Sequence, residues 1–243
     1  MRHDGRANDE LRPCTIEPGF IGAALGSVLI ASGRTRVICT ASLEERPPPW
    51  LKDGGWVTAQ YAMLPGSTQP RASRDPGGRG KEITRLIGRS LRACVDLGKL
   101  VSPTGPLSLV CDCDVIEADG GTRTASITGA FVALVLALRR LAADGRLAAD
   151  PVTQSVAAVS VGLVAGPGGA EPILDLCYVE DSAAIVDLNV VALTGGGLVE
   201  VQGTAEHGSF DRRQLDRLLD LAESGVARLH EIQRAALGGG AAA

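Results

Sequence analysis

The segment at residues 118–124 constrains the fold most, because a Gly-Gly pair there separates two runs with different hydrophobic patterns. Before it, residues 107–117 alternate between apolar and polar side chains, which predicts a strand with one buried face. After it, residues 125–141 are largely apolar on all sides, which predicts a helix buried in the core. We therefore expect a strand, a tight turn and a central helix in this order.

The turn between this strand and helix has the composition of an anion site. Gly120 and Gly121 would place backbone N–H groups at the start of the helix. Thr122, Arg123 and Thr124 add hydroxyl donors and a positive charge in the same turn. A Gly-Gly turn of this kind also serves simply to connect two elements, so both interpretations stay open at this point.

The predicted elements of the whole chain fall into two similar halves. The first half has predicted strands at residues 26–31, 35–42, 56–64 and 107–117 and predicted helices at 82–97 and 125–141. The second half has predicted strands at 155–164, 172–178, 186–193 and 198–203 and one long helix at 210–237, with Ser209 as its N-cap. We therefore expect an α+β fold whose halves share one core, with residues 1–237 as a single domain and 238–243 as a low-complexity tail.

Composition excludes several classes of protein. The net charge of −4 argues against a generally basic nucleic-acid coat, although it permits a local basic site. No apolar signal region follows the N-terminus, and the longest apolar run, residues 130–138, is too short to span a bilayer. Cys111 and Cys113 have the spacing of a metal-binding pair, but no second pair follows. We expect a cytoplasmic protein with reduced, buried cysteines and no membrane partner.

Positive charge is concentrated in one part of the chain. Residues 71–92 contain Arg71, Arg74, Arg79, Lys81, Arg85, Arg89 and Arg92, opposed only by Asp75 and Glu82. The last three arginines share one face of the predicted helix, which is typical of a solvated surface. Because they continue the arginines of the predicted loop at 65–80, a functional stripe is an equally open interpretation.

Two pairs of carboxylates are candidates for chemistry. Asp112 and Asp114 point to the polar side of the predicted strand at 107–117, where they are either catalytic or paired with arginines. Asp181 lies in a polar turn, and Asp187 opens an otherwise apolar strand, where a charge needs a partner. Converging carboxylates could hold Mg²⁺, or one could act as a general acid. The alternative is a helix-capping aspartate beside a salt-bridged one.

Three elements taken together indicate phosphoryl transfer, with nucleic acid as one candidate substrate. They are the anion turn, the arginine-bearing loop at residues 77–79 and the acidic pair at Asp181 and Asp187.

The chain resembles the ribonuclease PH family along almost its whole length. The resemblance is carried by Arg6 and by collinear motifs at residues 11–13, 26–29, 39–42, 55–59, 63–65, 85–93, 112–115, 118–124, 157–162, 180–183 and 201–206. Members of this family are phosphate-dependent 3′→5′ exoribonucleases related to polynucleotide phosphorylase and to exosome ring subunits. The resemblance implies two βαβα-type halves and a homohexameric ring built as a trimer of dimers.

The resemblance also implies an activity and a set of site residues. The expected reaction removes 3′-terminal nucleotides from tRNA precursors with inorganic phosphate and releases nucleoside diphosphates, reversibly. The implied phosphate ligands are Arg79, Gly121, Thr122 and Arg123. Asp181 and Asp187 are the implied catalytic pair, which holds Mg²⁺ or another divalent cation or protonates the leaving group. Arg71, Arg74 and Arg92 would contact the RNA backbone.

The chain departs from the family pattern mainly in the loop between residue 65 and Arg79, which is shorter than usual. An alternative to an active enzyme is a catalytically silent RNA-binding ring subunit of an exosome-like assembly, and a third possibility is a phosphorolytic subunit of such an assembly. Retention of the implied phosphate ligands and of the acidic pair argues against the silent subunit.

Overall fold

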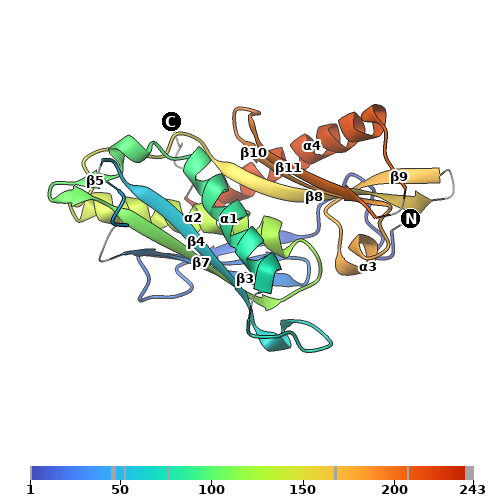
Figure 1. Ribbon diagram of the computed structural model, residues 1–243, viewed down its shortest axis with the longest axis horizontal. Helices are drawn as coiled ribbons and strands as arrows, with labels where there is room; N and C mark the ends of the chain where they lie inside the picture. The colour runs from blue at the N-terminus through green and yellow to red at the C-terminus, as the bar shows by residue number, and fades with distance from the viewer. Residues whose placement is uncertain are drawn as a thin grey trace.

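Helix α2 (Thr122–Ala143) runs through the middle of the protein and contacts both of its main β-sheets (Figure 1). This is a computed structural model, and it describes residues 2–44, 48–51, 53–75, 77–166, 169–206 and 208–238. The helix packs on β2, β3 and β7 in one sheet and on β8 in the other. Its all-round apolar sequence follows from this position, because no side of the helix faces solvent over most of its length.

The first sheet has the strand order β1-β2-β3-β7-β4. Its strands are β1 (Cys14–Pro18), β2 (Gly26–Ser32), β3 (Thr35–Leu43), β4 (Trp56–Met63) and β7 (Ser108–Glu117). All neighbours pair antiparallel except β4 and β7, which pair parallel and are joined by a crossover through α1 (Gly77–Ala93). Short elements complete this half: η1 (Pro65–Ser67), η2 (Leu97–Lys99), β5 (Val101–Ser102) and β6 (Gly105–Pro106).

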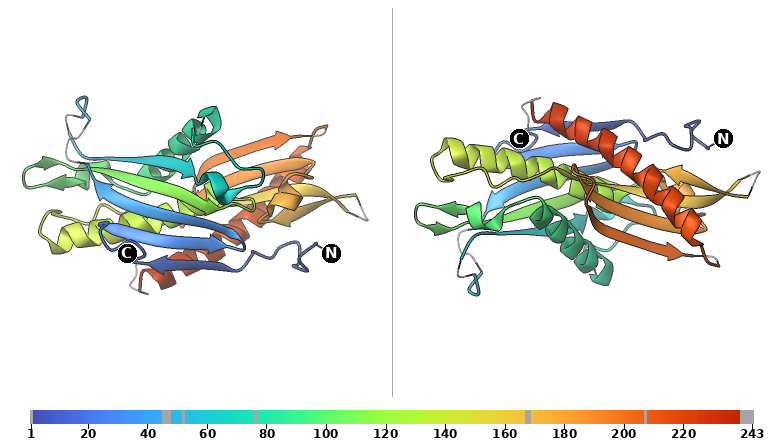
Figure 2. Two further views of the ribbon diagram at one scale, coloured as in Figure 1. Left: turned by 90° about the horizontal axis from the view of Figure 1, so that it is seen from below. Right: turned by 90° about the horizontal axis from the view of Figure 1, so that it is seen from above.

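The second sheet is antiparallel, with the strand order β11-β10-β8-β9. Its strands are β8 (Val156–Gly166), β9 (Gly169–Leu174), β10 (Val186–Leu193) and β11 (Leu198–Ala205). The short helix α3 (Tyr178–Asp181) interrupts the connection from β9 to β10, and α4 (Arg212–Ala236) packs on β8 and β9. Figure 2 shows the two sheets side by side along the molecule, the first blue to green and the second yellow to orange.

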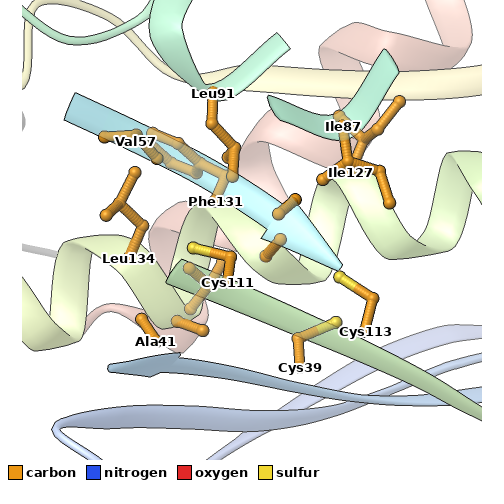
Figure 3. Packing of buried hydrophobic residues seen from close by; sticks show 14 of the residues in the cluster. Cys39, Ala41, Val57, Ile87, Leu91, Cys111, Cys113, Ile127, Phe131 and Leu134 are labelled. Atoms are coloured by element: carbon orange, nitrogen blue, oxygen red, sulfur yellow. The ribbon is translucent and has the colours of Figure 1, made fainter. Parts of the chain in front are cut away.

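Five of the six cysteines are buried, and Cys14 is partly buried. Figure 3 shows Cys39, Cys111 and Cys113 among aliphatic side chains and Phe131, and each of the three thiols is at most 1% exposed. All six cysteines of the chain are free. The prediction of buried cysteines is thus confirmed for five of the six, and Cys111 and Cys113 act as small apolar residues.

The long apolar helix α2 also meets the length and composition expected of a membrane span. However, 78% of its most apolar window is buried inside the protein. A helix covered in this way by two sheets is a core helix, which explains its hydropathy without a bilayer.

Several predicted boundaries were wrong. Helix α1 begins at Gly77 rather than at residue 82, so Arg79 lies in its first turn and not in a loop. The Asp75 carboxylate accepts a hydrogen bond from the Gly77 N–H at 2.9 Å, which stabilises a helix start that the glycines themselves disfavour. At its other end α1 stops at Ala93 rather than at residue 97.

Two boundaries in the second half also differ from the prediction. The strand predicted at 172–178 ends as β9 at Leu174, because Asp175 adopts the left-handed φ of 53° and turns the chain toward α3. The N-cap of α4 is Asp211, not Ser209, and its side chain accepts from the Gln214 N–H in a capping box. Of the predicted tail at 238–243, residues 239–243 lie outside the described residues.

The close packing of α2 on the first sheet predicts a large effect of one methyl group. Gly26 opens β2, and a Cβ there would overlap the Ala133 carbonyl oxygen and lie 2.6 Å from the Ala137 nitrogen. We expect Gly26→Ala to lower the free energy of unfolding by at least about 2 kcal/mol, measured by urea denaturation. Gly22→Ala is the matched control, since a Cβ there meets nothing within 4 Å, and its effect should stay within about 0.5 kcal/mol. Equal stability of both variants would contradict this account of the packing.

Candidate active site

The Gly-Gly turn is a tight connection between β7 and α2 that packs directly on another part of the backbone. Gly120 and Gly121 have φ values of 74° and 66°, in the region that glycine tolerates and most residues do not. A Cβ on Gly120 would lie 2.7 Å from backbone atoms of Leu176 and Cys177, so the turn rests directly against the segment that leads to α3. The first N–H groups of α2 have no intrahelical partner, as in any helix, and no side chain caps them.

The predicted site residues come together beside this turn. Two adjoining cavities share the same five lining residues, which are Arg79, Arg123, Asp181, Asp187 and Asn189. The two arginines come from the first turns of α1 and α2 in the first half. The carboxylates come from α3 and β10 in the second half. Gly121 and Thr122 line the same space, so all six residues predicted to bind phosphate or act as the acidic pair meet in one place.

The Arg123 guanidinium is held by Gln202 of the second half and by Glu82 of the first. Its Nη1 donates to Gln202 Oε1 of β11 at 2.7 Å and lies 3.6 Å from a Glu82 carboxylate oxygen. Gln202 Nε2 donates in turn to Glu82 at 2.7 Å. A separate hydrogen bond joins the side chains of Tyr61 and Thr122, whose hydroxyl oxygens lie 2.8 Å apart. Neither Gln202 nor Tyr61 was predicted from the sequence to take part in the site, and the only signal for Gln202 was its place in the motif at residues 201–206.

The two carboxylates are in unfavourable surroundings for a negative charge. Burial and the nearby Asp181 raise the pKa of Asp187 to about 6, and Arg123 and Arg79 only partly oppose this. Burial also raises the pKa of Asp181, against the charges of Arg79 and Arg123. Asp187 Oδ1 is buried with no hydrogen-bond partner. Neither side chain forms an ion pair or caps a helix among the residues described, so the interpretation as a capping and a salt-bridged aspartate is wrong.

The oxygen-bearing side chains on the acidic side of the cavity suit a hard divalent cation. Carboxylate and amide oxygens from Asp181, Asp187 and Asn189 line the cavity, and one carboxylate oxygen lacks any partner. Elsewhere in the described chain, His3, Cys177 and Glu180 also bring three donor atoms within 4.8 Å of one another. There, however, Glu180 is already ion-paired with Arg2 at 2.6 Å, which disfavours a cation.

The three arginines predicted to contact RNA lie in different places. Arg71 and Arg74 are exposed and flank Ala72, which lines the cavity beside the turn. Arg92 lies near the far end of α1, about 20 Å along the helix from Arg79 at 1.5 Å per residue. Its guanidinium donates to the Val57 carbonyl at 2.9 Å and lies 4.5 Å from the centre of the Trp56 ring. The structure therefore does not bring Arg92 to the cavity.

The acidic pair on β7 is separate from this site. Asp112 and Asp114 do not line either cavity, and neither forms an ion pair with an arginine among the residues the structure describes. Burial raises the pKa of both side chains, and for Asp112 the charge of Asp114 adds to it. The expected alternation of β7 is confirmed, since Leu109, Cys111 and Cys113 are buried on its other face.

The fold defines an α+β protein with two similar halves, and the cavity between them carries the arginines and carboxylates of a phosphoryl-transfer enzyme. The chain belongs to the 3′ exoribonuclease family, whose domain 1 matches residues 10–139 and whose domain 2 matches residues 154–225. The assignment of residues 1–237 to a single domain stays a prediction.

Close relatives carry one name. The chain is 51% identical over 245 residues to ribonuclease PH of Bacillus velezensis, covering 98% of this chain and 97% of that protein. Ribonuclease PH of Bacillus pumilus is 52% identical over 98% of each chain, and that of Bacillus subtilis is 51% identical over 98% of this chain and 97% of that protein.

Solved structures share the fold at lower identity. Rice Rrp46 superposes with a TM-score of 0.76 at 19% identity, covering 97% of this chain and all of that one. A chain of the Archaeoglobus fulgidus exosome with RNA bound to the active site gives 0.77 at 24% identity, over 95% and 91% of the two chains. A chain of an archaeal exosome core gives 0.73 at 25% identity, over 96% and 90%. The predicted fold class is therefore confirmed.

The raised pKa of Asp187 predicts how stability depends on pH. The folded protein binds this proton up to about pH 6, whereas the ordinary aspartate pKa is 3.8, so the carboxylate lowers the free energy of unfolding as pH rises through that window. Asp187→Asn cannot ionise, and we expect it to be more stable than the wild type by about 1–3 kcal/mol at pH 7.5, with the difference vanishing near pH 4. The free energies of unfolding are measured by urea denaturation in a phosphate-free buffer that contains a chelator.

The exposed Asp220→Asn is the matched control, and its free energy of unfolding at pH 7.5 should stay within about 0.5 kcal/mol of the wild type. A higher free energy of unfolding for the wild type than for Asp187→Asn at pH 7.5 would show that the ionised carboxylate stabilises the fold, which would contradict its raised pKa.

Proposed function

We propose that this protein is a phosphate-dependent 3′→5′ exoribonuclease that trims the 3′ ends of tRNA precursors and releases nucleoside diphosphates in a reversible reaction. One observation carries the proposal. Two arginines, the start of α2 and two carboxylates line one cavity, in a chain that is 51% identical to a protein named ribonuclease PH.

The arginines and the turn would bind the attacking phosphate. Arg79 and Arg123 neutralise the dianion, and the uncapped N–H groups at Thr122 and Arg123 donate hydrogen bonds to it. A phosphate oxygen attacks the terminal phosphodiester phosphorus in line with the 3′ oxygen of the preceding nucleotide. The new P–O bond makes a nucleoside diphosphate, the bond to the 3′ oxygen breaks, and that oxygen takes up a proton. No histidine base is needed, because phosphate is itself the nucleophile.

The carboxylates would act on the leaving oxygen. Asp181 and Asp187, assisted by Asn189, would hold Mg²⁺ or another divalent cation, which supplies positive charge to stabilise developing negative charge. Alternatively, a pKa near 6 keeps part of Asp187 protonated at neutral pH, so that its carboxyl group can donate a proton to the leaving 3′ oxygen.

The substrate and the assembly form part of the same proposal. Exposed Arg71 and Arg74 flank the cavity and would contact the RNA backbone near its 3′ end, whereas Arg92 would contact it about 20 Å further along α1. A homohexameric ring is supported by likeness to chains of exosome cores, and a reducing cytoplasm by six free cysteines. A silent ring subunit fits less well, because identity to exosome chains is only 24–25% and the acidic pair is retained.

Phosphate dependence is the direct test. With a tailed RNA and Mg²⁺, we expect shortening only when phosphate is present, with nucleoside diphosphates as products separated by anion-exchange chromatography. Arg79→Ala and Arg123→Ala should each raise the KM for phosphate by about tenfold or more, because each removes a charge-assisted contact. Exposed Arg217→Ala on α4 is the control. Nucleoside monophosphate products, or shortening without phosphate, would overturn the proposal.

The pH profile of turnover distinguishes the two roles of Asp187. At saturating phosphate and limiting Mg²⁺, we expect the rate to rise as pH increases toward about 6, because a carboxylate must lose its proton to bind a cation. Asp187→Asn should lower kcat by about a hundredfold or more. A kcat that falls through the same pH range would assign the general-acid role instead, and full activity in Asp187→Asn would remove this residue from the mechanism.

A further inference from the structure

The N-terminal segment contacts the anion turn through Arg12, which lines neither of the two cavities. In Figure 2 this segment (dark blue) runs from the second sheet toward the first. We infer that Arg12, held by a buried ion pair with Asp175, is a positioning residue that fixes the turn in its phosphate-binding conformation. This inference rests on the proposed phosphate-dependent function.

The Arg12–Asp175 pair is specific in geometry. Arg12 Nη2 lies 2.6 Å from Asp175 Oδ1, and Arg12 Nε donates to Asp175 Oδ2 at 3.0 Å. The backbone N–H of Arg12 donates to the same Oδ2 at 2.8 Å. Both residues are only 5% exposed, so the pair is held in a fixed orientation with little water to compete.

The remaining donors of Arg12 reach the turn. Nη1 donates to the Asp119 carbonyl at 2.6 Å, and both terminal nitrogens lie 3.5 Å from the Gly120 carbonyl. Thr35 Oγ1 donates to the Gly120 carbonyl at 2.7 Å and accepts from the Asp119 N–H at 2.9 Å. These contacts hold the carbonyls of the turn toward the interior. The N–H groups that follow Gly121 are thereby left for the cavity.

Asp175 connects this arrangement to the acidic side of the site. It lies between β9 and α3, and its backbone N–H donates to the Ser160 carbonyl at 2.7 Å. Arg2 of the same N-terminal segment donates to both carboxylate oxygens of Glu180 at 2.7 and 2.6 Å, next to Asp181. The segment therefore braces the turn of one half against the α3 region of the other.

A buried ion pair seldom adds much net stability, since desolvation offsets the attraction between the charges. Removing one partner alone would leave an uncompensated charge and could prevent folding. Replacing both partners together avoids that problem. Asn also tolerates the left-handed backbone found at Asp175, so Asp175→Asn keeps the local conformation.

The experiment compares phosphorolysis kinetics of the wild type, the double variant Arg12→Met/Asp175→Asn and the single variant Arg12→Lys. We expect the double variant to raise the KM for phosphate by about ten- to hundredfold while kcat at saturating phosphate changes less than about threefold. Arg12→Lys keeps the charge beside Asp175 but lacks the fork that reaches the Asp119 carbonyl, so its KM should rise by an intermediate factor. Stabilisation by phosphate, followed as a melting-temperature shift, should weaken in the same order.

Arg228→Ala is the matched control, because Arg228 donates to the Asp9 carbonyl of the same segment without reaching the turn. Its KM for phosphate should equal that of the wild type. If both Arg12 variants fold and keep the wild-type KM for phosphate, the positioning role is overturned while the proposed function stands. A wild type whose activity is indifferent to phosphate would overturn the proposed function and, with it, this inference.

Discussion

Burial of α2 against both sheets is the constraint on which the rest of the structure depends. The helix has no solvated face over most of its length, so each sheet must cover part of it. Its start, at the Gly-Gly turn, then necessarily lies where the two halves meet. An uncapped helix start at this boundary places backbone N–H groups beside side chains from both halves.

Charge in the cavity is arranged so that neither sign is fully compensated. Asp187 has a pKa of about 6 because burial and Asp181 outweigh the arginines, while Arg123 is shared between Gln202 and Glu82. An anion near the arginines and a cation near the carboxylates would each relieve part of this imbalance. Such residual imbalance is typical of a site that binds charged reactants rather than of a structural ion-pair network.

The sequence predicted the elements with a clear hydrophobic pattern better than it predicted the ends of elements that depend on individual contacts. Hydrophobic pattern located β7, α2 and α4, because burial of one face of β7 and α4, and of all sides of α2, is directly visible in the order of residues. The start of α1 was mispredicted, since glycines at 77 and 78 signal a loop and only the Asp75 carboxylate stabilises a helix there. The end of β9 depends on the left-handed backbone of Asp175, which is held by Arg12 from a distant part of the chain.

The sequence by itself determined the elements, the central buried helix and the residue types of the site, because these depend on local period and on motifs. Only the tertiary structure decided that Arg79 and Arg123 share a cavity with Asp181 and Asp187, and that Arg92 does not. It alone assigned partners to Gln202 and Arg12. The physical reason is that such contacts join residues far apart in the chain, and their geometry is set by the packing of two halves rather than by neighbours in sequence.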